Sequence, residues 1–124
     1  MDGKERQRMM DALCSVRCGA AQSEGELHEL VKGALESAGF SPVHEARLGP
    51  RCRIDFLVEG IGIEIKKSRP NPSLLKRQLA RYAQCEAVAA LLVVAPRGVN
   101  LPKQIGGKPV TMLALERLWG IWLP

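Results

Sequence analysis

The sequence lacks any hydrophobic run long enough to cross a membrane. Its longest apolar stretch is AVAALLVVA at 87–95, which is well short of the ~20 residues that a membrane-spanning helix needs. The N-terminal stretch MDGKERQRMM is charged and contains no apolar segment of the kind found in secretory signals. We therefore expect a cytoplasmic protein with no membrane association.

The sequence also lacks the patterns of a structural zinc site. Cys14 and Cys18 are four residues apart, but no second close cysteine pair or nearby histidine completes a set of ligands. Without an export signal, reduced thiols are expected. No repeat or low-complexity linker interrupts the chain, and its 124 residues, 46% of them hydrophobic, suffice for a single domain with its own core.

Positive charge is concentrated in one part of the chain. The net charge is +5, and residues 47–81 hold nine Lys or Arg against three acidic residues, whereas the rest of the chain holds nine against ten. A clustered basic surface fits a polyanion such as nucleic acid. On charge alone, a solvated basic face is an equally good interpretation.

After a first helix at 3–14, the apolar pattern predicts helices and strands in the order α-β-β-β-α-β-β. The second helix begins with Ser23 as N-cap and Glu26 as its capping box, and the third begins with Asn71 as cap and Pro72 at the first helical position. This order is typical of an α/β fold with a mixed central sheet flanked by helices. The expected helices are 3–14, 23–38 and 72–86, and the expected strands are 43–48, the two strands of a hairpin within 53–67, 87–95 and 109–114.

The stretch RIDFLVEGIGIEIKK at 53–67 predicts this hairpin, with its turn at Glu59-Gly60. With this turn one face is entirely apolar, and a slip of one residue would mix apolar and charged side chains on both faces. The pattern therefore favours a single register. The apolar face pairs Val58 with Ile61, Phe56 with Ile63 and Ile54 with Ile65, and the other face pairs Leu57 with Gly62, Asp55 with Glu64 and Arg53 with Lys66.

The second face places two carboxylates side by side. Directly opposed residues of an antiparallel pair have Cβ atoms about 4.5–5.5 Å apart, and like charges there repel each other. Lys66 projects from the same face as Glu64, and Gly62 leaves that face open beside Asp55. Oxygen ligands at this spacing suit Mg²⁺ or Mn²⁺. The competing interpretation is a solvent-facing hairpin in which Lys66 bridges the two acids.

The 23–38 helix carries an acidic residue within its apolar stripe. Glu24 falls inside the stripe, whereas Glu29 lies nearly opposite and is a weaker candidate, and Glu26 already serves the cap. Burying an unpaired charge is costly, so Glu24 is a candidate functional residue, with an interaction with the helix dipole as the alternative. His28 flanks the stripe and is expected to be peripheral.

The 72–86 helix shows a similar irregularity. Gln78 lies within its apolar stripe, and a buried amide needs hydrogen-bond partners. Substrate or a metal-bound water would supply one if Gln78 is functional, and a backbone carbonyl would serve if it is structural. The apolar residues of this stripe are Leu74, Leu75, Leu79, Tyr82 and Cys85.

These features in this order resemble the PD-(D/E)XK nuclease superfamily. The resemblance rests on SEGELHELV, RIDF, GIEIKKS and RQLARYAQ, which span about residues 22–86, with 87–95 fitting the following core strand. In size and pattern the chain is similar to the small VRR-Nuc and archaeal Holliday-junction-resolvase modules. The resemblance implies a restriction-endonuclease-like αβββαβ core at about 22–95, with the 3–14 helix and the 109–124 segment as additions. Ile54 stands where a proline usually precedes the aspartate.

The resemblance also implies residue roles. Asp55, Glu64, the helix-borne carboxylate Glu24 and the Ile65 carbonyl would ligate Mg²⁺ or Mn²⁺. Lys66 would orient or deprotonate the attacking water and stabilise the charge that builds on the phosphate. The implied catalytic set is Asp55, Glu64, Lys66, Gln78 and Glu24.

These observations predict a metal-dependent nuclease that hydrolyses DNA phosphodiester bonds. Its basic residues would grip the phosphate backbone without reading sequence. No zinc-finger or helix-turn-helix pattern for reading bases is present, so we expect specificity for DNA structure or ends. The expected nucleic-acid-binding residues are Arg51, Arg53, Lys67, Arg69, Arg77 and Arg81.

Two other functions fit the sequence less well. One is a non-catalytic nucleic-acid-binding module on the same fold, although the presence of Asp55, Glu64 and Lys66 together argues against it. The other is an interaction protein whose tail, with Trp119 and Trp122, docks a partner. The same tail would also suit the core or a homodimer contact, and a nuclease that cuts both strands would need a second active site.

Overall fold

The computed structural model describes residues 1–17 and 23–115. Within these ranges the protein is a mixed α/β fold, as the apolar pattern predicted, with three helices and a six-stranded mixed sheet. The tail residues Trp119 and Trp122, together with Cys18, lie outside the described residues.

Helices α2 and α3 begin at their predicted caps, and α1 begins at the predicted residue with a cap that was not predicted. Helix α1 (Gly3–Cys14) is capped by Asp2, α2 (Glu24–Ser37) by the Ser23–Glu26 capping box, and α3 (Pro72–Ala83) by Asn71 with proline at its first position. Side-chain caps satisfy backbone N–H groups that have no partner inside the helix.

The strands form one sheet in the order β1-β2-β3-β4-β6-β5. The first three run as an antiparallel meander, and β4 and β6 then add in parallel to β3. The predicted hairpin turn is confirmed, because Glu59 and Gly60 both have positive φ and Val58 pairs with Ile61. The strand bounds are β1 Val43–Gly49, β2 Cys52–Val58, β3 Ile61–Ile65, β4 Ala90–Ala95, β5 Gln104–Ile105 and β6 Lys108–Ala114.

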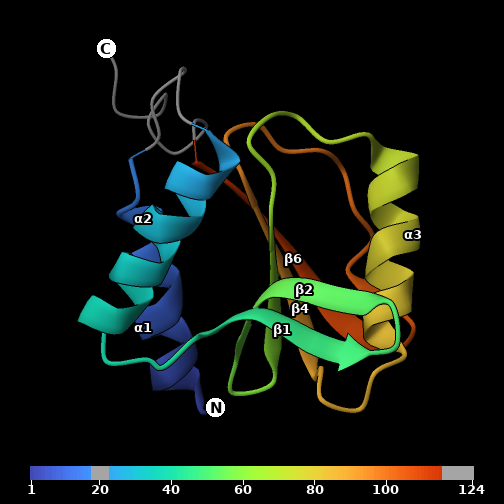
Figure 1. The fold of residues 1–124 in the computed structure, drawn as a ribbon, viewed down its shortest axis with the longest axis horizontal. Helices are drawn as coiled ribbons and strands as arrows, with labels where there is room; N and C mark the ends of the chain where they lie inside the picture. The colour runs from blue at the N-terminus through green and yellow to red at the C-terminus, as the bar shows by residue number, and fades with distance from the viewer. Residues whose placement is uncertain (18–22, 116–124) are drawn as a thin grey trace.

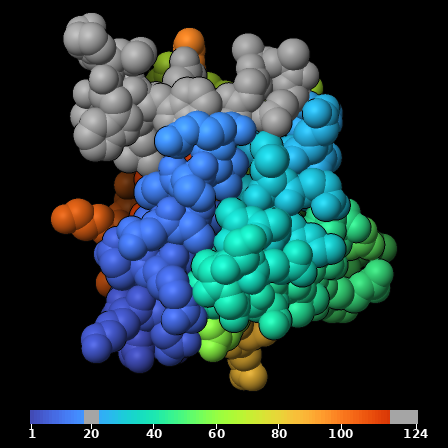
Figure 2. Space-filling model, turned by 90° about the vertical axis from the view of Figure 1, so that its left-hand side faces the viewer, coloured from blue at the N-terminus to red at the C-terminus, as the bar shows by residue number. Residues whose placement is uncertain are grey.

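The helices cover opposite faces of the sheet (Figure 1). Helices α1 and α2 lie together on one face, whose outer surface they form in Figure 2, and α3 lies on the other. Each face has its own apolar cluster. The cluster beneath α1 and α2 includes Leu13, Leu27, Val31, Phe56, Ile63, Ile65 and Val94, and the cluster beneath α3 includes Ala46, Ile54, Leu75, Leu79, Leu91 and Val93.

Several expected boundaries differ in the structure. Helix α3 ends at Ala83 rather than near Glu86, because the N–H groups of the next residues bond three residues back, in tight turns. Strand β4 begins at Ala90 rather than at 87. The short strand β5 was not predicted, and it pairs with β6 across a Gly106–Gly107 turn in which both residues have positive φ. Leu74, expected in the apolar stripe of α3, is 59% exposed.

The β1–β2 pair changes its packing face at the level of Asp55. Phe56 packs beneath α1 and α2, but Ile54 packs beneath α3, so the expectation that both share one face is wrong. Opposite, on β1, Glu45 has a φ of 51°, a left-handed conformation uncommon for residues other than glycine. Ala46, the partner of Ile54, also packs beneath α3. In both strands, therefore, the side chains switch from one face of the sheet to the other at the level of Asp55 and Glu45.

Candidate functional site

The backbone pairing of β2 with β3 ends just before the two carboxylate residues, Asp55 and Glu64. Beyond Phe56 and Ile63, which form the last ladder pair, the backbone N–H of Ile65 donates to Oδ2 of Asp55 at 2.7 Å. The expected direct pairing of Asp55 with Glu64 is thus replaced by a bond from main chain to side chain. The N–H and C=O of one residue in an extended strand point to the same side, so the Ile65 carbonyl also faces Asp55.

Glu64 is the one buried charged residue of the described ranges, and it is 5% exposed. Its Oε1 accepts a hydrogen bond from the Tyr82 hydroxyl at 3.0 Å, and its Oε2 accepts one from Nε2 of Gln78 at 3.1 Å. The ammonium of Lys66 lies 3.1 Å from the same Oε2. A solvent-facing hairpin therefore does not describe Glu64, and the partner of the Gln78 amide is this carboxylate.

Tyr82 is a site residue that the sequence reasoning missed. Its hydroxyl accepts a hydrogen bond from Gln78 Nε2 at 3.0 Å and lies 3.1 Å from the carbonyl oxygen of Arg53. The single hydroxyl proton can therefore be donated to either the Arg53 carbonyl or the Glu64 carboxylate. Tyr82 was assigned to the apolar stripe of α3, but it follows Gln78 by four residues, and that spacing places both on one helix face.

One histidine, His28, lies beside the other carboxylate and contacts a second histidine, His44. His28 Nε2 is 3.7 Å from Oδ2 of Asp55, and His28 Nδ1 is 3.0 Å from Nε2 of His44. Both rings lie against Phe56, with centroids 5.8 Å and 4.6 Å from its ring. The expectation that His28 is peripheral is therefore wrong. His28 follows Glu24 by four residues, the spacing that places two residues on one helix face.

Burial dominates the protonation of the two carboxylates. Burial, and then the charge of Asp55, raises the pKa of Glu64 from its ordinary 4.5 to about 7, against the opposing effect of Lys66. Burial also raises the pKa of Asp55, while the Ile65 N–H and His28 lower it. Strong pKa shifts of this origin are common at functional sites, because such sites hold charges out of water.

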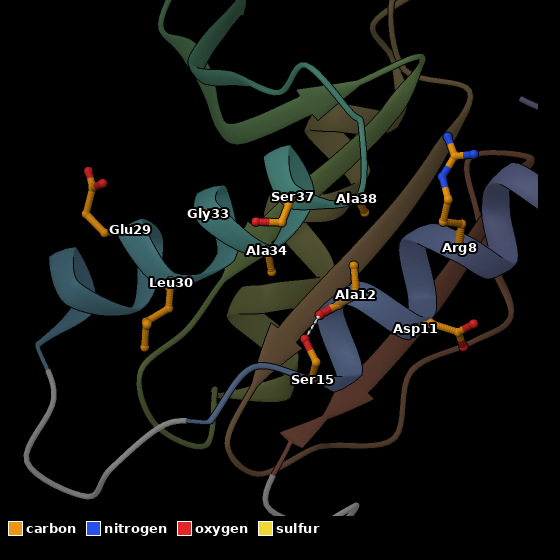
Figure 3. A pocket seen from close by; sticks show the side chains of 10 residues that line it. All are labelled: Arg8, Asp11, Ala12, Ser15, Glu29, Leu30, Gly33, Ala34, Ser37 and Ala38. Carbon is orange, nitrogen blue, oxygen red and sulfur yellow. Dashed lines mark hydrogen bonds between the residues drawn. The ribbon is translucent and has the colours of Figure 1, made fainter.

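The two candidate helix carboxylates lie in different places. Glu24 is the first residue of α2 and is exposed, so its predicted burial is wrong, but its charge still raises the pKa of Asp55. Glu29 instead lines an open groove of about 650 Å³ between α1 and α2, with Arg8 and Asp11 (Figure 3). The structure therefore brings Glu24, and not Glu29, near the carboxylates.

The expected nucleic-acid-binding residues are all exposed. Arg51 and Arg53 line an open pocket of about 550 Å³ at the β1–β2 turn, which they share with Arg47. Arg81, on α3, lies close enough to Cys52 to lower the pKa of its thiol, although burial raises that pKa overall. The β1–β2 turn and the C-terminal half of α3 therefore lie close together. The exposed residues are Arg51, Arg53, Lys67, Arg69, Arg77 and Arg81.

Asp55 is the carboxylate of the site that has oxygen lone pairs left for a hard divalent cation. Within 1–17 and 23–115, no three His, Cys, Asp or Glu side chains form a group able to hold a metal ion. Cations at phosphate-processing sites are commonly held by one or two carboxylates, with water and substrate phosphate as the other ligands. Asp55 accepts a hydrogen bond on Oδ2 from the Ile65 N–H and has carboxylate lone pairs left for such an ion. Glu64 has three polar partners.

No protein-family model, curated protein or solved structure matches this chain. In the part of the chain that the structure describes, no helix has the length and apolar character needed to span a membrane.

Proposed function

We propose that this protein is a metal-dependent nuclease that hydrolyses DNA phosphodiester bonds on a restriction-endonuclease-like fold. The observation that carries the proposal is the meeting of Asp55, Glu64 and Lys66 where β2 and β3 part, beneath the Gln78 amide of α3. Nothing in the packing of the hairpin requires a buried carboxylate beside a half-buried one there, and burying charge is costly.

The chain's own residues would divide the work. Asp55 and the Ile65 carbonyl, which face each other, would hold Mg²⁺ or Mn²⁺, with Glu64 and the exposed Glu24 contributing from either side. A bound divalent cation polarises a phosphoryl oxygen and lowers the pKa of water. Lys66, 3.1 Å from Glu64, would orient the attacking water and stabilise the developing negative charge.

The hydrogen bonds of α3 would keep Glu64 in place for this task. Gln78 and Tyr82 each bond a different oxygen of the carboxylate, which fixes both its position and its rotation. A ligand held in this way loses little conformational entropy when an ion or substrate arrives. Gln78 and Tyr82 therefore act as positioning residues in this proposal.

DNA would lie across the basic surface at the β1–β2 turn and α3. Arg53 belongs to both regions, because its side chain lines the arginine pocket and its carbonyl contacts Tyr82. Contacts to phosphate oxygens position a protein on DNA without reading its sequence. A substrate chosen by structure or by its ends, and a homodimer when both strands are cut, belong to this proposal.

One observation favours the second candidate, a non-catalytic nucleic-acid-binding module. Both oxygens of Glu64 already have protein partners, so this carboxylate is satisfied without a cation. Such a module would bind DNA with steep salt dependence but would neither bind Mg²⁺ at Asp55 nor cleave.

Calorimetric titration of Mg²⁺ and Mn²⁺ into the protein tests the proposal. We expect binding to the wild type and its loss in Asp55→Ala, with circular dichroism to show that the variant is folded. Glu29→Ala, on the outer face of α2, is the matched control and should bind like the wild type. Unchanged binding in a folded Asp55→Ala variant would refute the metal assignment.

A further inference from the structure

The His28 ring is held in a buried position with one nitrogen unused. Its side chain is 13% exposed, and its Nε2 is a buried polar atom without a hydrogen-bond partner. Leaving such an atom unpaired destabilises the folded protein. The nearest charged atom is Oδ2 of Asp55, at 3.7 Å, too far for a direct hydrogen bond.

His44 accounts for the orientation of this ring. The contact between His28 Nδ1 and His44 Nε2, at 3.0 Å, uses the other imidazole nitrogen. When His28 Nδ1 donates its proton there, Nε2 carries a lone pair that points at the Asp55 carboxylate. Two lone pairs that face each other at this separation repel unless a proton or a metal cation lies between them.

We infer that His28 Nε2 is a nitrogen ligand of the divalent cation held at Asp55, with His44 as the residue that positions the ring. The inference rests on the proposed function for the existence of that cation and adds a ligand that the carboxylate motif does not contain. In metal sites a ligating histidine commonly bonds a second group through its other nitrogen, which fixes its tautomer and orientation. His44 fills that place here, with its own ring stacked on Phe56.

The nitrogen ligand has a consequence for the choice of metal. Mg²⁺ strongly prefers oxygen ligands, whereas imidazole favours first-row transition ions. A site that combines Asp55 and His28 should therefore bind Mn²⁺ more tightly than Mg²⁺. Replacement of His28 by glutamine should reduce that preference, because the ligand lost is the one that distinguishes the two ions.

Pulsed electron paramagnetic resonance of bound Mn²⁺ tests the inference without reference to activity. The chain contains two histidines, so an untagged protein grown with ¹⁵N-histidine reports on His28 and His44 alone. We expect electron spin echo modulation from a directly coordinated histidine nitrogen, with a change of isotope pattern on labelling. The signal should disappear in His28→Gln and persist in His44→Phe, which keeps an aromatic ring over Phe56.

Mn²⁺ affinity provides the second measurement. We expect His44→Phe to weaken Mn²⁺ binding by about 10–100-fold, the usual effect of losing a residue that orients a metal ligand, and His28→Gln to weaken it at least as much. Glu29→Gln, on the same helix, should change nothing. Mn²⁺ that binds in an Asp55-dependent manner without histidine modulation would overturn this inference and leave the proposed function standing. The absence of any Asp55-dependent Mn²⁺ binding would overturn both.

Discussion

Glu64 should make the metal-free protein less stable as the pH rises. Its pKa is raised in the folded state from 4.5 to about 7, so between these values the folded protein binds more protons than the unfolded chain. The free energy of unfolding therefore falls as pH increases through this window. The stabilising effect of the protonated form is complete below about pH 4.5 and is lost as the pH passes 7.

The magnitude follows from the shift. Each unit of pKa is a tenfold change in proton affinity, so the shift of Glu64 corresponds to about 3 kcal/mol of unfolding free energy. The side chain is 6% exposed, so solvent screens little of this effect. Glutamine in its place removes the ionisation and retains a carbonyl oxygen for Gln78 and Lys66. Tyr82 can then turn its hydroxyl proton to the Arg53 carbonyl, which lies 3.1 Å away.

Urea unfolding of the wild type and Glu64→Gln, in EDTA between pH 5 and pH 8.5, measures the effect. We expect similar stability at pH 5 and a variant that is more stable than the wild type by up to about 3 kcal/mol at pH 8.5. The difference between the two proteins cancels the titration of other groups. Glu36→Gln, at an exposed position of α2, should show no such pH dependence. A Glu64→Gln variant that is less stable than the wild type at pH 8.5 would refute the reasoning.

Two further substitutions test the geometry around the site. Tyr82→Phe removes the hydroxyl between Gln78 and Glu64, and should cost about 1–3 kcal/mol in urea unfolding at pH 8; full stability would show that the hydroxyl bonds do not matter. A Cβ atom at Gly62 would lie 2.6 Å from Cδ1 of buried Ile54, so Gly62→Ala should destabilise by about 1–3 kcal/mol. Adding Ile54→Val removes that Cδ1 and should restore part of the loss; the steric argument fails if the double variant is no better.

Much of the fold follows from local chemistry that the sequence displays. The caps at Ser23 and Asn71 and the turn at Glu59-Gly60 need only their own neighbours, and the structure confirms all three. The register of the hairpin is confirmed from Val58–Ile61 to Phe56–Ile63. The expected pairs beyond it, Ile54 with Ile65 and Arg53 with Lys66, do not form. What alternation could not show is the change of face at Ile54, which lies beside the level at which Glu45, on another strand, has a φ of 51°.

The sequence predicted the site residues that lie within the hairpin. It missed the contacts that join a helix to a strand. Asp55, Glu64 and Lys66 lie within one hairpin, so their proximity could be predicted from pairing rules. The contacts of Tyr82 with Glu64 and of His28 with Asp55 join helices to strands, and their formation depends on how each helix docks. Helical phase marked Gln78 as unusual without showing that its partner is a carboxylate.

The most direct test of the central claim is DNA cleavage with Mg²⁺ or Mn²⁺, measured on linear, supercoiled and branched substrates for the wild type and Lys66→Ala. Lys66 is 28% exposed and contacts Glu64 at 3.1 Å, so its removal should leave the fold, metal binding and DNA binding largely intact. The proposed mechanism predicts cleavage by the wild type and none by the variant. A folded, metal-loaded wild type that binds DNA but cuts no substrate, or a Lys66→Ala variant that cuts at the wild-type rate, would contradict it.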